Sequence, residues 1–155
     1  MKNMDIEEVR EFVRNSSESS VIYVGADSER HKKNGKWYAT YTVVVVVHID
    51  GKRGCKIFGR TDIEIDYDAK KSRPRLRLMN EVYKAVDVYL ELIDAIGDRE
   101  SHIHLDLNVS EKHGSSCVTQ EAIGYVRGVC GIEPNVKPTA FAASYAADRF
   151  TEIAA

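Results

Sequence analysis

The sequence VIYVGAD, residues 21–27, decides how this chain is expected to fold. It is rich in β-branched residues, which favour a strand, and it ends at Asp27. An acidic side chain at the end of an apolar strand is costly unless it is solvated, paired or bound to a metal. The segment therefore predicts a buried strand and, directly after it, a position suited to chemistry.

Two turn signals indicate how the chain continues from this strand. Asn34-Gly35 is typical of a two-residue hairpin turn, and Asp50-Gly51 is a second signal of the same kind. Residues 37–49 and 55–65 are then expected to complete an antiparallel meander of three strands. The valine run at residues 43–47 is apolar at every position, which predicts a central strand covered on both faces.

The rest of the chain alternates between helical and strand patterns. Leu78, Val82, Ala85, Tyr89 and Ile93 recur near helical spacing and predict a long helix that ends at about residue 96. Other expected helices cover residues 4–15, 115–131 and 140–153, and the expected strands cover residues 102–108 and 135–138. Strands that are entered through helices favour parallel crossovers.

The expected architecture is an α/β fold with a five-stranded mixed sheet. Three antiparallel meander strands and two parallel strands form the sheet, with helices on both faces and an extra N-terminal helix. The length of 155 residues predicts a single domain over residues 1–155. Residues 1–18 would form the N-terminal helix and its connector, and residues 20–155 the core.

Composition narrows the classes of protein to be considered. With 43% hydrophobic residues, the chain lacks the signature of disorder, and a net charge of −2 requires any nucleic-acid surface to be local. The three cysteines contain no C-x-x-C pair, which favours reduced thiols and a cytoplasmic protein. The acidic start is unlike a signal peptide, and the longest apolar run is too short to span a membrane.

Four acidic residues stand at positions where acidic side chains are unusual. Asp27 and Asp106 interrupt apolar strands, Glu81 lies between apolar helix positions, and Asp148 lies in an alanine-rich helix. Each alone has an ordinary interpretation. Asp27 could form a turn or a helix cap, Glu81 could pair with a basic neighbour on a solvated helix face, Asp106 could lie on an exposed strand face, and Asp148 could pair with the adjacent helix surface.

Together, such carboxylates suit one kind of chemistry. Mg²⁺ prefers hard oxygen ligands, and two ions about 4 Å apart can activate a water and stabilise the leaving oxygen of a phosphodiester. Four carboxylates would offset the charge of the ions. Their joint placement in the order of strands and helices favours a shared site.

Several motifs resemble a known family. VGADS (24–28), RLMNEV (77–82), HLDLN (104–108) and KPTAFAASYAADRF (137–150) look like the bacterial YkuK-type family of uncharacterised ribonuclease H-like proteins. The order of the four acids along strands and helices resembles the ribonuclease H fold and its active site. The resemblance implies that Asp27, Glu81, Asp106 and Asp148 are catalytic residues that hold two Mg²⁺ or Mn²⁺ ions. It also implies a nuclease acting on RNA, RNA/DNA hybrid or structured DNA.

Four further residues are auxiliary candidates. Asn108 follows Asp106 by two residues and either orients a metal-bound water or ends the strand. Ser28 and Ser144 either bond a ligand carboxylate or phosphate, or are small residues packed under the sheet. Lys137 either meets a phosphate or is solvated.

A basic run leads into the helix that carries Glu81. Its members are Lys70, Lys71, Arg73, Arg75 and Arg77. Beside a carboxylate site they would neutralise phosphates and make nucleic-acid binding salt-sensitive; the alternative is a solvated helix start. Cations are disfavoured at the positive N-terminal end of a helix, so their presence there favours an anionic partner from outside the chain.

Four other acidic residues do not predict a functional site. Asp62, Glu64, Asp66 and Asp68 alternate and are expected on a solvent-facing strand face.

The alternative functions are a 3′–5′ exonuclease of the four-acid type, a non-catalytic nucleic-acid-binding module with the same fold, and a phosphotransferase. The sequence lacks the Gly-rich phosphate loop that a phosphotransferase would be expected to carry.

Overall fold

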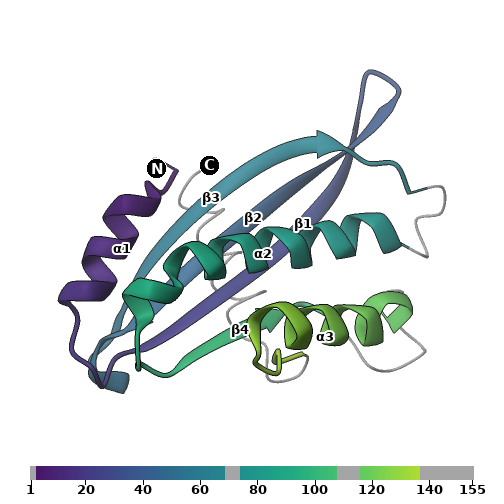
Figure 1. Ribbon diagram of the computed structural model, residues 1–155. Coiled ribbons are helices and arrows are strands. Elements are labelled where there is room, and N and C mark those ends of the chain that lie inside the picture. Colours follow the sequence, from purple (N-terminus) through teal and green to yellow (C-terminus); the bar gives the residue numbers. More distant parts are fainter. Residues whose placement is uncertain (1–2, 69–73, 108–115, 137–155) are drawn as a thin grey trace.

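The computed structural model describes residues 3–68, 74–107 and 116–136 (Figure 1). It places helices on a strongly twisted sheet. The elements in chain order are α1 (Ile6–Asn15), β1 (Val21–Lys33), β2 (Lys36–His48), the 3-10 turn η1 (Ile49–Gly51), β3 (Cys55–Ile65), α2 (Arg75–Ile96), β4 (Ser101–Leu105) and α3 (Ser116–Cys130).

The sheet has the mixed topology that the sequence predicts. Its strand order is β3-β2-β1-β4, with β1, β2 and β3 in an antiparallel meander and β4 parallel to β1. Asn34 and Gly35 both have positive φ, 51° and 79°, which is the conformation of a two-residue hairpin turn. Asp50 and Gly51 also have positive φ and lie in η1 between β2 and β3.

The prediction of five strands is wrong for the part of the chain described, where the sheet has four. At the place of the expected fifth strand there is one parallel bridge, between His104 and Asn135. The Asn135 N–H donates to Ile103 and its carbonyl accepts from Leu105, both at 2.8 Å. Pro134 precedes this bridge, and a proline has no N–H to donate, which limits how far pairing extends in that direction.

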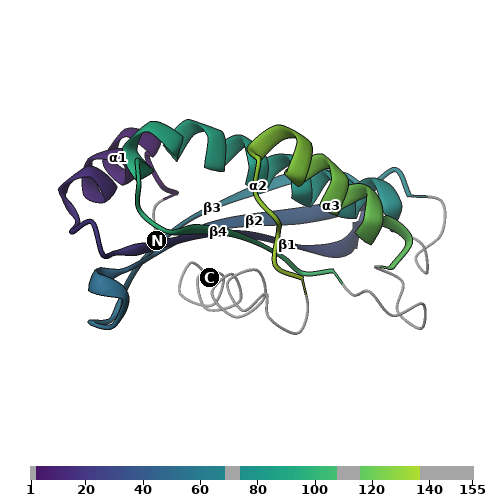
Figure 2. The same cartoon turned by 60° about the horizontal axis from the view of Figure 1, so that its bottom comes forward.

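The three α-helices of the described residues all cover the same face of the sheet (Figure 2). Helix α2 packs on β1, β2 and β4, and α1 and α3 flank it. The core between these layers is continuous and includes Val9, Val24, Val45, Val82 and Leu105. The expected closing helix at residues 140–153 lies outside the described residues.

The exposure of side chains in β2 and α2 tests two predictions made from the hydrophobic pattern. All five valines at residues 43–47 are buried, which confirms that the centre of β2 is covered on both faces. In α2, Leu78, Val82, Ala85 and Tyr89 face the core as predicted, but Ile93 is 42% exposed and Leu92 is fully buried instead. A helix advances 3.6 residues per turn, so the buried stripe continues at residue 92 after residue 89. None of the helices in the described ranges is long and apolar enough to cross a membrane.

Candidate active site on adjacent strands

Two of the predicted acids lie beside each other in the sheet, Asp27 within β1 and Asp106 directly after the end of the parallel strand β4. The last registered pair of β1 and β4 is Ala26 with Leu105, so Asp27 and Asp106 each come one residue later. Ala26 and Leu105 are buried in the core under the helices. Because side chains alternate along a strand, Asp27 of β1 projects to the face away from α2.

The prediction that the strand ends at Asp27 is wrong. Strand β1 continues for six residues to Lys33, and Asp27 pairs with Thr42 of β2. The polar residues after Asp27 remain in the ladder because antiparallel pairing uses the backbone and does not require apolar side chains. Asp27 is therefore neither a turn former nor a helix cap, and it is held in the interior of a strand.

Glu81 approaches this region from α2 and is almost completely buried, with 3% of its surface exposed. The Ser28 hydroxyl donates to its carboxylate, and the Arg77 guanidinium lies 3.7 Å from the same oxygen. The pairing with a basic neighbour that the sequence allowed is present, but on a buried helix face instead of a solvated one. Glu81 thus meets β1 through Ser28.

The electrostatics of Glu81 connect three of the four predicted acids. Burial raises its pKa well above the usual range, and the negative charges of Asp27 and Asp106 raise it further. The hydrogen bond from Ser28 and the charge of Arg77 lower it, without cancelling the rise. The structure therefore brings Asp27 and Asp106 within electrostatic range of Glu81.

The residues fit a hard cation by donor type, because carboxylate oxygens are what Mg²⁺ and Mn²⁺ prefer. Within residues 3–68, 74–107 and 116–136, however, no three acidic, histidine or cysteine side chains are grouped closely enough to hold one ion. Asp148 lies outside the described residues, as do the auxiliary candidates Asn108, Ser144 and Lys137. In this arrangement Ser28 and Arg77 compensate the charge of Glu81.

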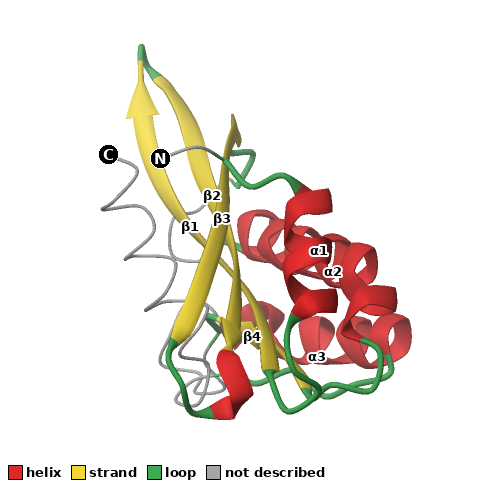
Figure 3. Cartoon of the chain, turned by 90° about the vertical axis from the view of Figure 1, so that its left-hand side faces the viewer, coloured by secondary structure: helices red, strands yellow, loops and turns green. Residues whose placement is uncertain are grey.

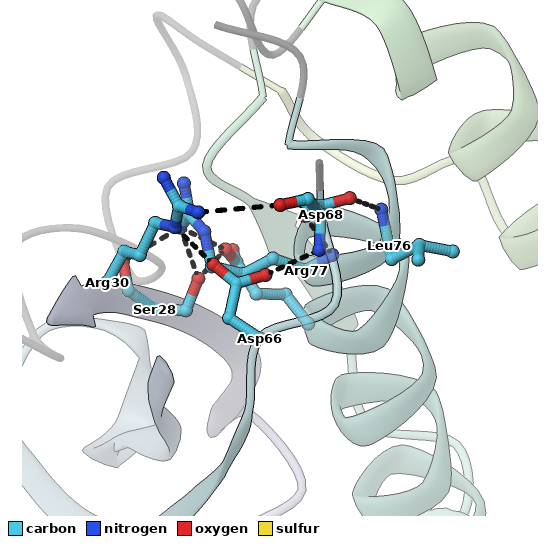
Figure 4. A network of polar contacts seen from close by, with 7 residues as sticks. Ser28, Arg30, Asp66, Asp68, Leu76 and Arg77 are labelled. Carbon is cyan, nitrogen blue, oxygen red and sulfur yellow. Dashed lines mark hydrogen bonds and ion pairs between the residues drawn. The ribbon is translucent and has the colours of Figure 1, made fainter. Parts of the chain in front are cut away.

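A polar network fixes the start of α2 beside the acids (Figure 4). Arg30 of β1 forms an ion pair with Asp66 at 2.5 Å, and Asp66 accepts the Asp68 N–H at 3.0 Å. The Asp68 carboxylate accepts the backbone N–H groups of Leu76 and Arg77 at 2.8 and 2.9 Å. These bonds tie the first turn of α2 to β1, and Glu81 follows one turn later.

For Asp66 and Asp68, though not for the partly exposed Asp62 and Glu64, this network corrects the prediction of a solvent-facing strand face. Asp66 and Asp68 are each only 8% exposed, while Asp62 and Glu64 pair with Lys84 of α2. The sequence signal that was missed is the basic residue Arg30, which β1 carries to the same end of the sheet. The Asp68 carboxylate, from outside the helix, accepts N–H groups that a helix cap would otherwise satisfy.

The basic run divides into two parts. Lys70, Lys71 and Arg73 lie outside the described residues. Arg75 binds the Glu121 carboxylate of α3 at 2.6 and 2.8 Å, so its cation already has a partner. Arg77 donates to the Ser28 hydroxyl at 2.6 Å, which makes it part of the Glu81 site.

A comparison with protein families gives one result for the chain as a whole. The family model described as ribonuclease H-like matches residues 5–152. Neither the curated proteins nor the solved structures include a significant match to this sequence.

Proposed function

Because this chain belongs to the ribonuclease H-like family, we propose that it is a divalent-metal-dependent nuclease that hydrolyses phosphodiester bonds. The observation that carries the proposal is the buried Glu81 carboxylate close to Asp27 of β1 and to Asp106, which follows the neighbouring strand β4; the charges of both disfavour the ionised form of Glu81. Buried like charges that oppose one another are typical of a site that binds cations. The proposed substrates are RNA, RNA/DNA hybrid and structured DNA.

The proposed ligands are Asp27, Glu81, Asp106 and Asp148, the last assigned from the sequence alone. Two Mg²⁺ or Mn²⁺ ions, when bound there, would supply Lewis-acid stabilisation and an activated water for attack on the phosphorus. The acids would orient the ions and offset their positive charge, so no separate protein base is required. Ser28 and Arg77 hold the Glu81 carboxylate in position.

The motifs VGADS, RLMNEV, HLDLN and KPTAFAASYAADRF support a finer assignment to the YkuK-type family. This finer assignment is part of the proposal. It covers nearly the whole chain and includes the segment around Asp148.

Metal binding is tested by thermal melting with and without Mg²⁺ or Mn²⁺. We expect the ions to raise the melting temperature of the wild type and to leave that of Asp106→Asn unchanged, because one ligand is removed. Asp98→Asn is the matched control, since Asp98 is exposed after α2 and loses the same charge. A wild-type melting temperature that does not respond to either ion would overturn the metal site.

Activity is tested with labelled single strands, duplexes, hybrids and branched DNA in Mn²⁺. We expect cleavage of at least one of these substrates by the wild type and by Asp98→Asn, and its loss in Asp27→Asn. Cleavage that survives Asp27→Asn would come from a contaminant or from another site, and the mechanism would then be wrong.

A second candidate function is a nucleic-acid-binding module without catalysis. The observation in its favour is that Ser28 and Arg77 already compensate Glu81 within the described residues. A metal-dependent rise in melting temperature that disappears in Asp106→Asn would exclude this passive module. The four-acid 3′–5′ exonuclease remains within the first proposal and is distinguished by whether cleavage starts from an end.

A further inference from the structure

The paired ends of β1 and β2 extend past the helices as a two-stranded arm (Figure 3). We define the hairpin arm as residues 29–38. Strand β3 accompanies β2 only as far as the pair Tyr38 and Ile65, so the tip beyond it is formed by β1 and β2 alone. Two-stranded ribbons are marginally stable alone, and here the Arg30–Asp66 ion pair fixes the base of the arm.

One face of the hairpin arm is continuous with Asp27. Side chains alternate along β1, so His31 and Lys33 project to the same face as Asp27. The register pairs His31 with Tyr38 and Lys33 with Lys36, which brings two basic side chains beside two rings. The rings of His31 and Tyr38 are stacked, with centroids 6.1 Å apart and planes at 22°.

Next to these rings the surface is hollowed and carries an exposed apolar side chain. Ile63 of β3 is 67% exposed, and a pocket of about 310 Å³ is lined by His31, Lys33, Asn34, Tyr38 and Ile63. A partly exposed ring beside an exposed isoleucine offers a flat apolar surface that water solvates poorly. Such a surface, rimmed by lysines, fits a planar ligand that also carries negative charge.

The arm is strongly basic, and its lysines are not neutralised by ion pairs within the described residues. Its ten residues include Arg30, Lys32, Lys33 and Lys36 and a single acid, Glu29. Arg30 pairs with Asp66, but in the part of the chain that the structure describes no carboxylate forms an ion pair with any of the three lysines. Glu29 lies between Asp27 and His31 on the strand, on the side of the acidic site.

We propose that the hairpin arm binds single-stranded nucleic acid and leads the strand toward Asp27. A base would stack on Tyr38 and His31 while Lys33 and Lys36 contact phosphates, the combination of rings and cations that single strands favour. Asp27 and Lys33 are six residues apart on β1, or about 20 Å at 3.3 Å per residue. The inference deepens the proposed nuclease function and rests on it for the direction of the strand.

The arm is tested by fluorescence anisotropy in EDTA, where no metal-dependent cleavage occurs. The probes are labelled 15-nucleotide oligo(U) and oligo(dT), with a 15-base-pair duplex as the comparison. We expect Lys33→Gln with Lys36→Gln to weaken single-strand binding and to lower the slope of log affinity against log salt by about 1.4, or roughly 0.7 for each phosphate that is no longer neutralised. The charge-matched control is Lys52→Gln with Lys56→Gln, at the opposite end of β2 and β3.

Stacking is tested at Tyr38 with the same probes. We expect Tyr38→Ala to weaken binding at least about 5-fold and Tyr38→Phe to retain it, because the ring and not the hydroxyl meets the base. Thermal melting of each variant establishes that it is folded. The lysine variants, which change exposed side chains, test the arm even where Tyr38→Ala fails to fold.

Three results would each overturn the proposal that the hairpin arm binds single strands. They are wild-type affinity in the Lys33 and Lys36 double variant, an equal loss in the control pair, and no binding of either single strand by the wild type. These outcomes are separate from failure of the nuclease proposal, which is decided by the metal response of Asp106→Asn. If the protein responds to metal but the Lys33 and Lys36 double variant still binds single strands as the wild type does, the nuclease proposal stands and the proposed role of the arm is wrong.

Discussion

Glu81 is a buried carboxylate with opposing influences on its charge. Burial and the acids Asp27 and Asp106 disfavour its ionised form, while Ser28 and Arg77 favour it. The net effect raises its pKa, so in the absence of metal the ionised form destabilises the folded state. A cation bound among the three acids would reverse that effect.

The substitution Glu81→Gln is expected to stabilise the metal-free protein at pH 8. The native pKa lies above the unfolded one, so the contribution of Glu81 to stability is complete below the unfolded pKa and is lost as pH rises through the native pKa. Each pKa unit between the two corresponds to about 1.4 kcal/mol. Urea unfolding in EDTA at pH 4.5 and pH 8 measures the difference, and a variant less stable than the wild type at pH 8 would contradict the assignment.

His104 gives a pH dependence of the opposite sign. It is 1% exposed, and burial with the nearby charge of His102 lowers its pKa to about 4. The unfolded chain takes up a proton near pH 6.5, so stability is lost as pH falls below that value. Between pH 6.5 and pH 5 we expect the free energy of unfolding in EDTA to fall by about 1.5 to 2 kcal/mol.

The control for His104 is His104→Gln, which removes the titrating ring. We expect the loss of stability between pH 6.5 and pH 5 to be largely absent in this variant. An unchanged profile in His104→Gln would assign the acid sensitivity to another group.

At the scale of elements, α2 begins where Asp68 accepts two of its first backbone N–H groups. Asp68→Ala leaves these donors without the carboxylate and is expected to lower the free energy of unfolding by about 1 to 2 kcal/mol. Asp68→Asn keeps one acceptor oxygen and should lose less. Urea unfolding measures both, with exposed Asp98→Ala as the control; equal stability of Asp68→Ala and the wild type would show that the cap contributes nothing.

Most elements could be predicted from sequence, because period and turn chemistry are local properties. The hairpin turn at Asn34-Gly35 and the stripe of α2 follow from backbone conformation and helical spacing. The length of β1 could not be predicted this way. Its last six residues are polar, and they remain in the sheet only because β2 lies opposite.

At the scale of the whole molecule, Arg99 joins the ends of two helices. Its guanidinium donates to three carbonyls at and just after the end of α1 and to two at the end of α2. We expect Arg99→Ala to lower the free energy of unfolding by roughly 1.5 to 3 kcal/mol, because bonds from a charged donor to helix ends are removed.

Arg99→Lys should recover only part of that loss, since an ammonium group cannot reach carbonyls on both helices at once. Chemical unfolding of the two variants is the measurement. The control is Arg53→Ala, whose ion pair with Asp50 is exposed and worth little. If Arg99→Ala costs no more than Arg53→Ala, the connection between α1 and α2 does not stabilise the fold.

The sequence by itself determined the meander and the crossover helix, because turn residues and hydrophobic period act over a few neighbours. Only the tertiary structure decided that Asp27 of β1 lies beside the end of β4, where Asp106 follows, that Glu81 is buried beside Ser28, and that Arg77 contacts the same carboxylate. Ser28 and Glu81, for example, are 53 positions apart in the chain. Pairing register and helix packing set these relations, and no local pattern encodes either.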